Sequence, residues 1–195
     1  FLADSIKNTT LLRSLDISYM DIGPEKMKYL AEAIKHHPSL EILKIGGNKI
    51  GITGIMHMAD AIKHNTSLKD LDLRAMDLGS DGALHYIAEA ITNHPSLKKI
   101  DLSNNYIGLF KGAMHITEAL KNHSSLTAID LRNNYIGNDG AIHLAEALRH
   151  HQSLRKLDLE NNEIGQERLN YILESILLNS TLESLNLNGN SLHGK

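Results

Sequence analysis

The 195-residue sequence contains no Cys and no Trp, and only three Pro and two Phe. Without Cys the chain can form neither disulfides nor a thiolate metal site, and it has no cysteine nucleophile. It also lacks an excess of either charge, because 20 Lys and Arg stand against 23 Asp and Glu. Such a balance argues against a general binder of nucleic acid or of anionic membranes. No apolar run approaches the roughly 18 residues of a membrane-spanning helix.

An internal repeat of 28 or 29 residues runs along the chain. Each copy reads L-x-x-(L/I)-x-(L/I)-x-x-(N/M)-x-(I/L), and a Gly follows directly in the first six copies. Leu and Ile supply most of the large apolar residues, a narrow choice that is typical of a repeating structure. The copies begin at Leu12, Leu40, Leu68, Leu97, Leu126, Leu154 and Leu182.

Each copy combines the periods of a strand and of a helix. The alternation around Ile129 and Leu131 predicts a short strand, and residues 140–150 place Leu144 and Leu148 on the apolar stripe of a helix. The two longer copies carry their extra residue between the Gly and the helix, where the start of a helix can absorb it. One unit cannot bury its apolar face alone, so the units must stack into an arc with parallel strands inside and helices outside.

An amide side chain recurs where the chain leaves most of the predicted strands. A buried amide can bond the backbone groups that have lost their strand partners there, and each such group left unpaired would cost about 1–3 kcal/mol. Met20 and Met76 occupy the same place, so we expect those two turns to be filled by apolar side chains and to find other hydrogen-bond partners. The predicted ladder consists of Asn48, Asn105, Asn134, Asn162 and Asn190.

This pattern resembles the leucine-rich repeat family, specifically the ribonuclease-inhibitor-like subclass with units of 28–29 residues. Seven copies at near-constant spacing extend the resemblance over essentially the whole chain. It implies an α/β solenoid, a horseshoe segment with a parallel β-sheet on its concave face and α-helices on its convex face. Residues 1–195 would form a single domain. Because its first residues match the helix of a repeat, we expect a fragment of a longer chain.

The side chains between the strand leucines are predicted to face the concave side. Four successive Asp would repel one another there, and neighbouring Lys and Arg would offset part of that repulsion. For any single Asp the favoured interpretation is a solvated consensus residue, whereas the face as a whole indicates a mixed-charge strip for a protein ligand. Two tyrosines either extend the strip at its rim or pack across the turn. The candidate partner-binding residues are Lys44, Asp72, Arg74, Lys99, Asp101, Asp130, Arg132, Lys156, Asp158, Glu160, Tyr106 and Tyr135.

Eleven of the twelve His form two sets of interest. His57, His85, His115 and His143 recur on four predicted helices, and we predict no metal site because neighbouring helices lie about 10 Å apart. The second set lies at helix C-termini, where a cation complements the helix dipole by about 0.3–1 kcal/mol. Protonation of the histidines could make the affinity for a partner depend on pH between about 5 and 7. The second set is His36, His37, His64, His94, His123, His150 and His151.

No spacing of Ser, His and Asp singles out a nucleophile with its base, so we predict no enzyme activity, no cofactor and no metal. The leading hypothesis is a module that binds a protein partner through the concave face and adjoining loops, with no nucleic acid and no membrane insertion. The resemblance implies a role like that of innate immune receptors or bacterial effectors, and the lack of Cys favours the cytoplasm, or the host cytosol for an effector. The alternative is a GTPase-activating or other enzyme-linked leucine-rich repeat protein whose catalytic part lies outside this segment.

Overall fold

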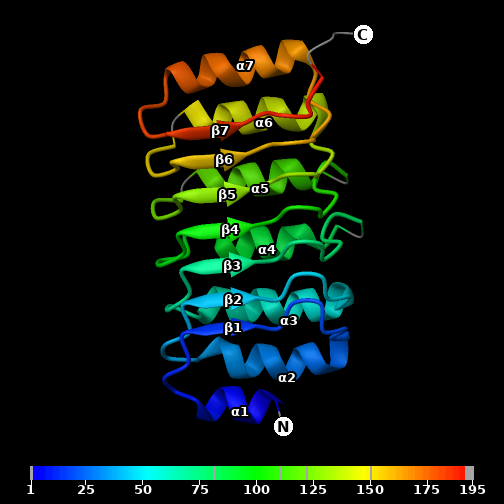
Figure 1. Ribbon diagram of the computed structural model, residues 1–195, viewed down its shortest axis with the longest axis vertical. Helices are drawn as coiled ribbons and strands as arrows, with labels where there is room; N and C mark the ends of the chain where they lie inside the picture. Colours follow the sequence, from blue (N-terminus) through cyan, green and yellow to red (C-terminus); the bar gives the residue numbers. More distant parts are fainter. Residues whose placement is uncertain (1, 81, 110, 122, 150, 192–195) are drawn as a thin grey trace.

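In a computed structural model that describes residues 2–80, 82–109, 111–121, 123–149 and 151–191, seven strands alternate with seven helices. The strands pair in parallel and in sequence order in one open sheet, and the helices lie behind it (Figure 1). The strands are β1 (Ser14–Asp16), β2 (Ile42–Lys44), β3 (Asp70–Asp72), β4 (Lys99–Asp101), β5 (Ala128–Asp130), β6 (Lys156–Asp158) and β7 (Ser184–Asn186). The helices are α1 (Leu2–Asn8), α2 (Pro24–Lys35), α3 (Gly51–His64), α4 (Leu84–Ile91), α5 (Gly112–Lys121), α6 (Gly137–Arg149) and α7 (Gln166–Leu177).

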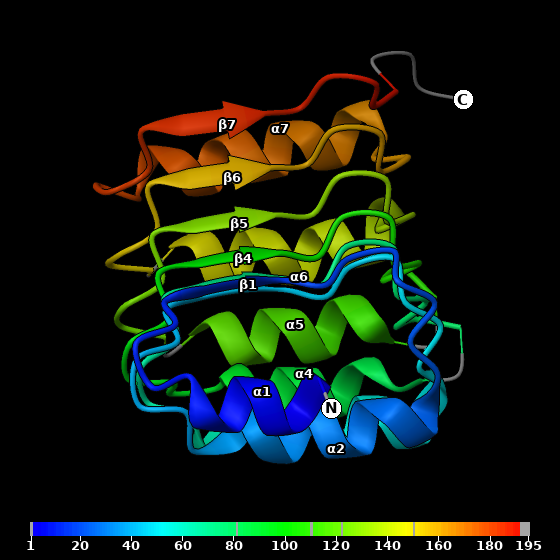
Figure 2. The same ribbon diagram turned by 60° about the horizontal axis from the view of Figure 1, so that its bottom comes forward.

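The core is a continuous apolar layer between the sheet and the helices, which form two separate layers in Figure 2. The strand register places Leu43 beside Leu71 and Leu71 beside Ile100, and all three side chains are buried. Burying such a side chain contributes roughly 1.5–3 kcal/mol. A strand occupies less width than a helix, so the stack curves with its strands on the inside, as the sequence predicts.

The two longer repeats differ from the others at the start of their helices. The helices α3 and α6 begin directly at the repeated glycines, Gly51 and Gly137. In the longer units a turn intervenes, and α4 and α5 begin only at Leu84 and Gly112. This confirms the prediction that the start of the helix absorbs the extra residue.

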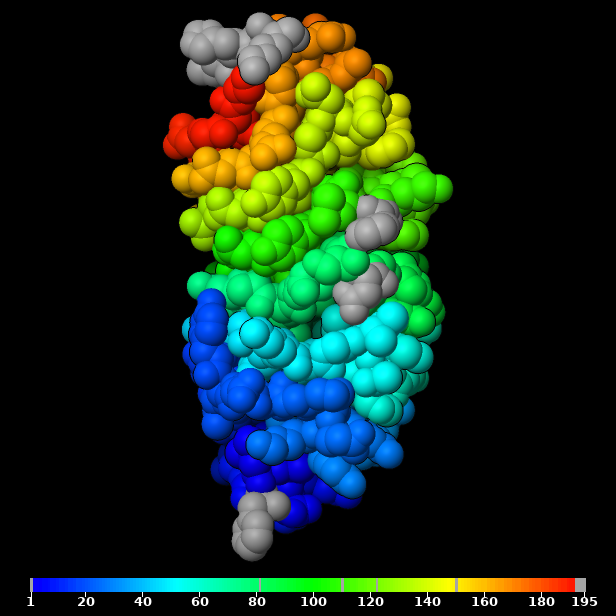
Figure 3. All heavy atoms as spheres, turned by 90° about the vertical axis from the view of Figure 1, so that its right-hand side faces the viewer, coloured from blue at the N-terminus to red at the C-terminus, as the bar shows by residue number. Residues whose placement is uncertain are grey.

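The turns that follow the strands stack directly on one another along one edge of the molecule, which faces the viewer in Figure 3. A Cβ atom on Gly79 would collide with the carbonyl oxygen of Tyr106, and one on Gly108 with the carbonyl oxygen of Tyr135. Glycine is therefore required at these two positions because the backbone of the next unit occupies the space of a side chain.

The predicted amide ladder lies beneath these turns. The Oδ1 atom of Asn134 accepts the backbone N–H groups of Asn105 at 2.8 Å and Ile107 at 3.4 Å. Its Nδ2 atom donates to the carbonyl oxygens of Leu102 and Leu131, both at 2.9 Å. Each amide thus ties its own turn to the turn before it, and the backbone groups that leave the strands are satisfied.

The two Met turns obtain their hydrogen bonds from the Asn of the next unit. Asn48 accepts the N–H of Met20 at 3.1 Å, and Asn105 accepts that of Met76 at 2.9 Å. The apolar filling that we expected occurs at Met76, which is 4% exposed. It is wrong for Met20, which is 56% exposed, because no turn in the described part of the chain packs on its other side.

A second polar ladder, which the sequence did not predict, joins the helix ends to the following strands. The Nδ1 atom of His123 accepts the backbone N–H groups of Ser125 at 3.3 Å and Leu126 at 3.2 Å. Asn65 and Asn179 make the equivalent bonds through Oδ1. The ladder consists of His37, Asn65, His94, His123, His151 and Asn179.

This ladder corrects the prediction for the histidines at the helix ends. Burial lowers the pKa of His94, His123 and His151, and an imidazole that accepts through Nδ1 is the neutral form. These side chains therefore bond the backbone and do not complement the helix dipole as cations. His36 and His64 are exposed, as the dipole interpretation requires, and His150 lies outside the described residues.

None of the helices in the described part of the chain has the length and apolar composition to cross a bilayer.

Candidate functional site

The concave face carries a row of carboxylates along four adjacent strands. The register places Asp72, Asp101, Asp130 and Asp158 side by side on β3 to β6. Each Oδ1 atom accepts the backbone N–H of the residue two positions later, at 2.9–3.1 Å. The carboxylates therefore also terminate the strands, a role that the sequence interpretation missed. The signal was the Asp between the two apolar residues of the (L/I)-x-L segment in these four copies, since Asp favours such local backbone bonds.

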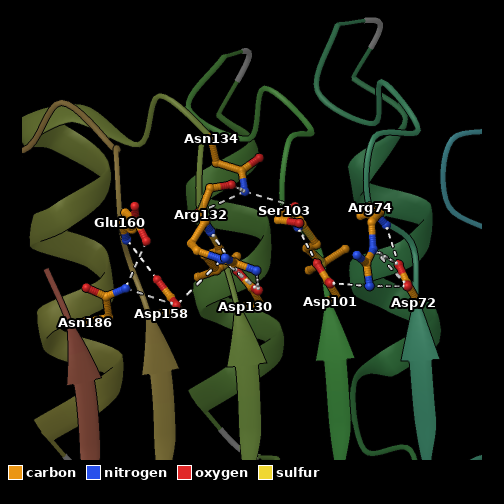
Figure 4. Close-up of polar contacts among 12 residues, drawn as sticks. Asp72, Arg74, Asp101, Ser103, Asp130, Arg132, Asn134, Asp158, Glu160 and Asn186 are labelled. Carbon is orange, nitrogen blue, oxygen red and sulfur yellow. Dashed lines mark hydrogen bonds and ion pairs between the residues drawn. The ribbon is translucent and has the colours of Figure 1, made fainter. Parts of the chain in front are cut away.

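Two arginines hold these four carboxylates in pairs (Figure 4). The Nη2 atom of Arg74 lies 2.6 Å from Oδ2 of Asp72 and 3.2 Å from Oδ2 of Asp101. Arg132 places Nη2 2.6 Å from Oδ2 of Asp130 and Nε 3.6 Å from Oδ2 of Asp158. The carboxylates raise the pKa of both guanidinium groups, chiefly through side-chain hydrogen bonds. The arginines thus offset the repulsion within the row, as predicted.

The last strand adds a neutral donor to this arrangement. The Nδ2 atom of Asn186 donates to Oδ2 of Asp158 at 3.2 Å and to Oε2 of Glu160 at 3.1 Å. In the middle of the row, burial raises the pKa of Asp101, and the carboxylates of Asp130 and Asp72 raise it further. Two hydrogen bonds from Ser103 oppose this shift. The row is therefore a fixed, largely paired set of charges.

The lysines of the face behave differently from the arginines. Lys44 approaches Asp16 at 3.9 Å, across the first strand pair. Lys99 and Lys156 flank the row, as predicted from the sequence, but they make no side-chain hydrogen bond or ion pair within the described part of the chain. All three lysines line an open hollow of about 430 Å³ over β2 to β7, together with the four Asp.

Tyr106 and Tyr135 lie beside this face, in the turns that follow β4 and β5. Their rings stack in parallel, with centres 5.8 Å apart and an interplanar angle of 1°. They remain 43% and 49% exposed, respectively. The two side chains therefore pack across adjacent units and at the same time present aromatic surface at the rim.

The helix histidines on the convex side lie closer together at one place than the helix spacing implied. The ring centres of His85 and His115 are 6.0 Å apart, on α4 and α5. Within residues 2–191, gaps excepted, no third His, Asp or Glu joins any such pair to form a group able to hold a metal ion.

These features define a solenoid of strand–turn–helix units with a charged concave face. The family model described as "Leucine Rich repeat" matches the chain at residues 36–59, 122–145, 150–167 and 178–195. These four segments are leucine-rich repeats, and the unit length of the chain is compatible with the ribonuclease-inhibitor-like subclass.

Three solved structures are similar to this fold. The leucine-rich repeat-containing protein LegL7 from Legionella pneumophila matches with a TM-score of 0.56 and 21% identity, over 94% of this chain and 68% of that one. The actin-binding site 2 of leiomodin-1 matches with a TM-score of 0.49 and 14% identity, over 90% and 86% of the two chains. The C-terminal domain of tropomodulin from Caenorhabditis elegans matches with a TM-score of 0.48 and 14% identity, over 90% and 92%.

At these identities the likeness concerns the fold. No curated protein matches the sequence significantly.

Proposed function

We propose that this protein is an interaction module that holds another protein on its concave face and on the adjoining loops that carry Tyr106 and Tyr135. The observation that carries the proposal is the preformed charged hollow over β2 to β7. Its arginines are held by two carboxylates each, so little side-chain freedom remains to be lost when a partner binds.

The mixture of charges on this face favours a protein over a nucleic acid. Five carboxylates and four basic side chains line the hollow, so it has no excess of positive charge to attract a phosphate backbone. A protein surface can present both signs of charge, and such complementarity governs specificity and association rate. The stacked tyrosines add aromatic surface of the kind that is enriched in protein interfaces.

Replacing Ala128 tests this proposal, because it lies on β5 and lines the hollow without taking part in any of the ion pairs. Ala128→Trp would fill the hollow, and we expect it to abolish capture of the proteins that the wild type retains from a lysate of its source cells. Met114→Trp is the matched control, since Met114 is 40% exposed on the convex helix α5. Retention of the same proteins by Ala128→Trp would exclude the concave face as the interface.

The second candidate function is an enzyme-linked leucine-rich repeat protein whose catalytic part lies outside these 195 residues. No observation in the described part of the chain favours it.

A further inference from the structure

Some basic side chains of the concave face form ion pairs with other described residues of the protein, and others do not. Arg74 and Arg132 each contact two carboxylates, and Lys44 lies 3.9 Å from Asp16. Lys99 and Lys156 are exposed, and in the described part of the chain their ammonium groups have no hydrogen-bond or ion-pair partner. These two lysines are therefore the cations of the face that remain available to a partner.

The strand register brings the two lysines to either side of a small residue. Lys99 on β4 pairs with Ala128 on β5, and Ala128 pairs with Lys156 on β6. Their Cα atoms are thus two strand spacings apart, or about 9.6 Å. All three residues line the hollow. A methyl group between two flexible four-carbon stems leaves room for both ammonium groups to approach one anion from opposite sides.

The carboxylates nearest to the lysines are already engaged, with one exception. Asp101 is held by Arg74, Asp130 by Arg132, and Asp158 by Arg132 and Asn186. Asp70 on β3 is the neighbour of Lys99 on the side away from Ala128, and its side chain has no bonded partner among the described residues. Asp70 can therefore compete with a partner for Lys99, while Lys156 has the neutral Ser184 as its outer neighbour.

We propose that Lys99 and Lys156 together receive an acidic side chain, Asp or Glu, of the protein partner, which lies over Ala128. This inference rests on the proposed function and names the chemistry of the partner at the centre of the hollow. A single carboxylate placed there contacts two ammonium groups that have no other partner among the described residues, while Asp101, Asp130 and Asp158 stay paired with the arginines. The partner is accordingly a protein segment with an exposed acidic residue at its contact point.

A five-residue glutamate peptide serves as the probe, and its binding at low salt is followed through the backbone amide resonances of the 195-residue protein. We expect saturable shifts centred on Lys99, Ala128 and Lys156, and none of comparable size with a five-residue lysine peptide. Exposed ion pairs are individually weak, so the double substitution Lys99→Ala with Lys156→Ala should lower the affinity for the glutamate peptide by about 5-fold or more. Asp70→Asn should strengthen it, because it removes the competing carboxylate.

Lys28→Ala with Lys98→Ala is the matched control, since it removes the same charge from exposed lysines that do not line the hollow. Equal weakening by the two double variants would overturn the proposal, because it would reduce the effect to net charge. Shifts confined to other surfaces would overturn it as well.

The protein partner is tested separately from the peptide. If Ala128→Trp abolishes capture of the partner and Lys99→Ala with Lys156→Ala does not weaken it, the acidic contact is wrong and the concave interface stands. If neither variant affects capture, both proposals fail.

Discussion

His123 is a buried titratable residue that accepts the same backbone hydrogen bonds as an amide side chain. It is 3% exposed and bonds two backbone N–H groups through Nδ1, as Asn65 and Asn179 do through Oδ1 two ladder positions away. Its Nε2 atom is buried and has no hydrogen-bond partner among the residues that the structure describes. Burial, with smaller contributions from His94, His151 and Lys98, lowers its pKa to about 4. The histidine thus supports the fold only while it is neutral.

The stability of the protein should therefore fall in acid. The unfolded chain binds a proton at this residue near its ordinary pKa of 6.5, whereas the folded chain resists protonation until about pH 4. The stabilisation is complete above pH 6.5 and is lost progressively as the pH falls toward 4, by at most about 3 kcal/mol for this residue. Urea unfolding at a series of pH values measures the loss.

His123→Asn is the informative variant, because Asn makes the same backbone bonds at other positions of the ladder without titrating. We expect it to fold and to have a shallower dependence of unfolding free energy on pH between 6.5 and 4. His57→Asn, on an exposed residue of α3, is the control and should leave the slope unchanged. An identical slope in His123→Asn and the wild type would contradict this account.

The role of a residue could be predicted only where its position in the repeat determines its hydrogen-bond partner. The Asn ladder follows from its place after each strand, because backbone groups that leave a sheet need partners wherever it ends. The His ladder was missed because His occurs at both exposed and buried positions at the helix ends, and the sequence does not separate His36 from His37. The pairing of Arg74 and Arg132, and the lack of pairing of Lys99, depend on side-chain conformations that the strand register does not determine.

At the scale of the element, the turn after each strand is the most constrained segment. Its backbone is packed against the next turn, and residues on both sides of the ladder Asn have positive φ, as at Asn133 and Tyr135 with 55° each. Such values are uncommon outside glycine and are tolerated here because the ladder bonds hold the turn. The repeated Gly was visible in the sequence, but its function in each unit was not.

The glycines of equivalent positions should differ sharply in their response to substitution. Gly108→Ala would place a Cβ against the carbonyl oxygen of Tyr135, so the two turns would have to separate, and we expect a loss of about 2 kcal/mol or more. A Cβ on Gly23 would meet nothing within 4 Å, and its φ of −84° suits any residue. Gly23→Ala should therefore be neutral or stabilising by up to about 1 kcal/mol.

Thermal or urea unfolding of the two variants checks the contrast. A similar loss of stability in both would mean that conformational preference, and not the close approach of the next turn, sets the requirement for glycine.

At the scale of the whole molecule, the fold follows from the sequence because every unit has the same apolar face to bury against its neighbours. The buried Leu and Ile recur at fixed intervals, so stacking in sequence order is the arrangement that covers all of them. Within the described residues, strands pair and helices pack only with their neighbours in sequence. The register of each pair of neighbouring strands thus determines which residues lie side by side on the concave face. The rows of residues were therefore predictable, whereas the ion pairs were not.

This purely nearest-neighbour packing has a consequence for how disturbances spread. Ile129 on β5 is 3% exposed in the core, and Ile129→Ala should cost about 2–5 kcal/mol. In a quasi-one-dimensional stack, this loss of stability is confined mainly to the affected unit and its two interfaces with the neighbouring units. Amide hydrogen exchange should therefore accelerate most in β5, next in β4 and β6, and least in β1. If all seven strands accelerated equally, the chain would unfold as one cooperative body, and coupling between distant units would have to act through the sheet as a whole.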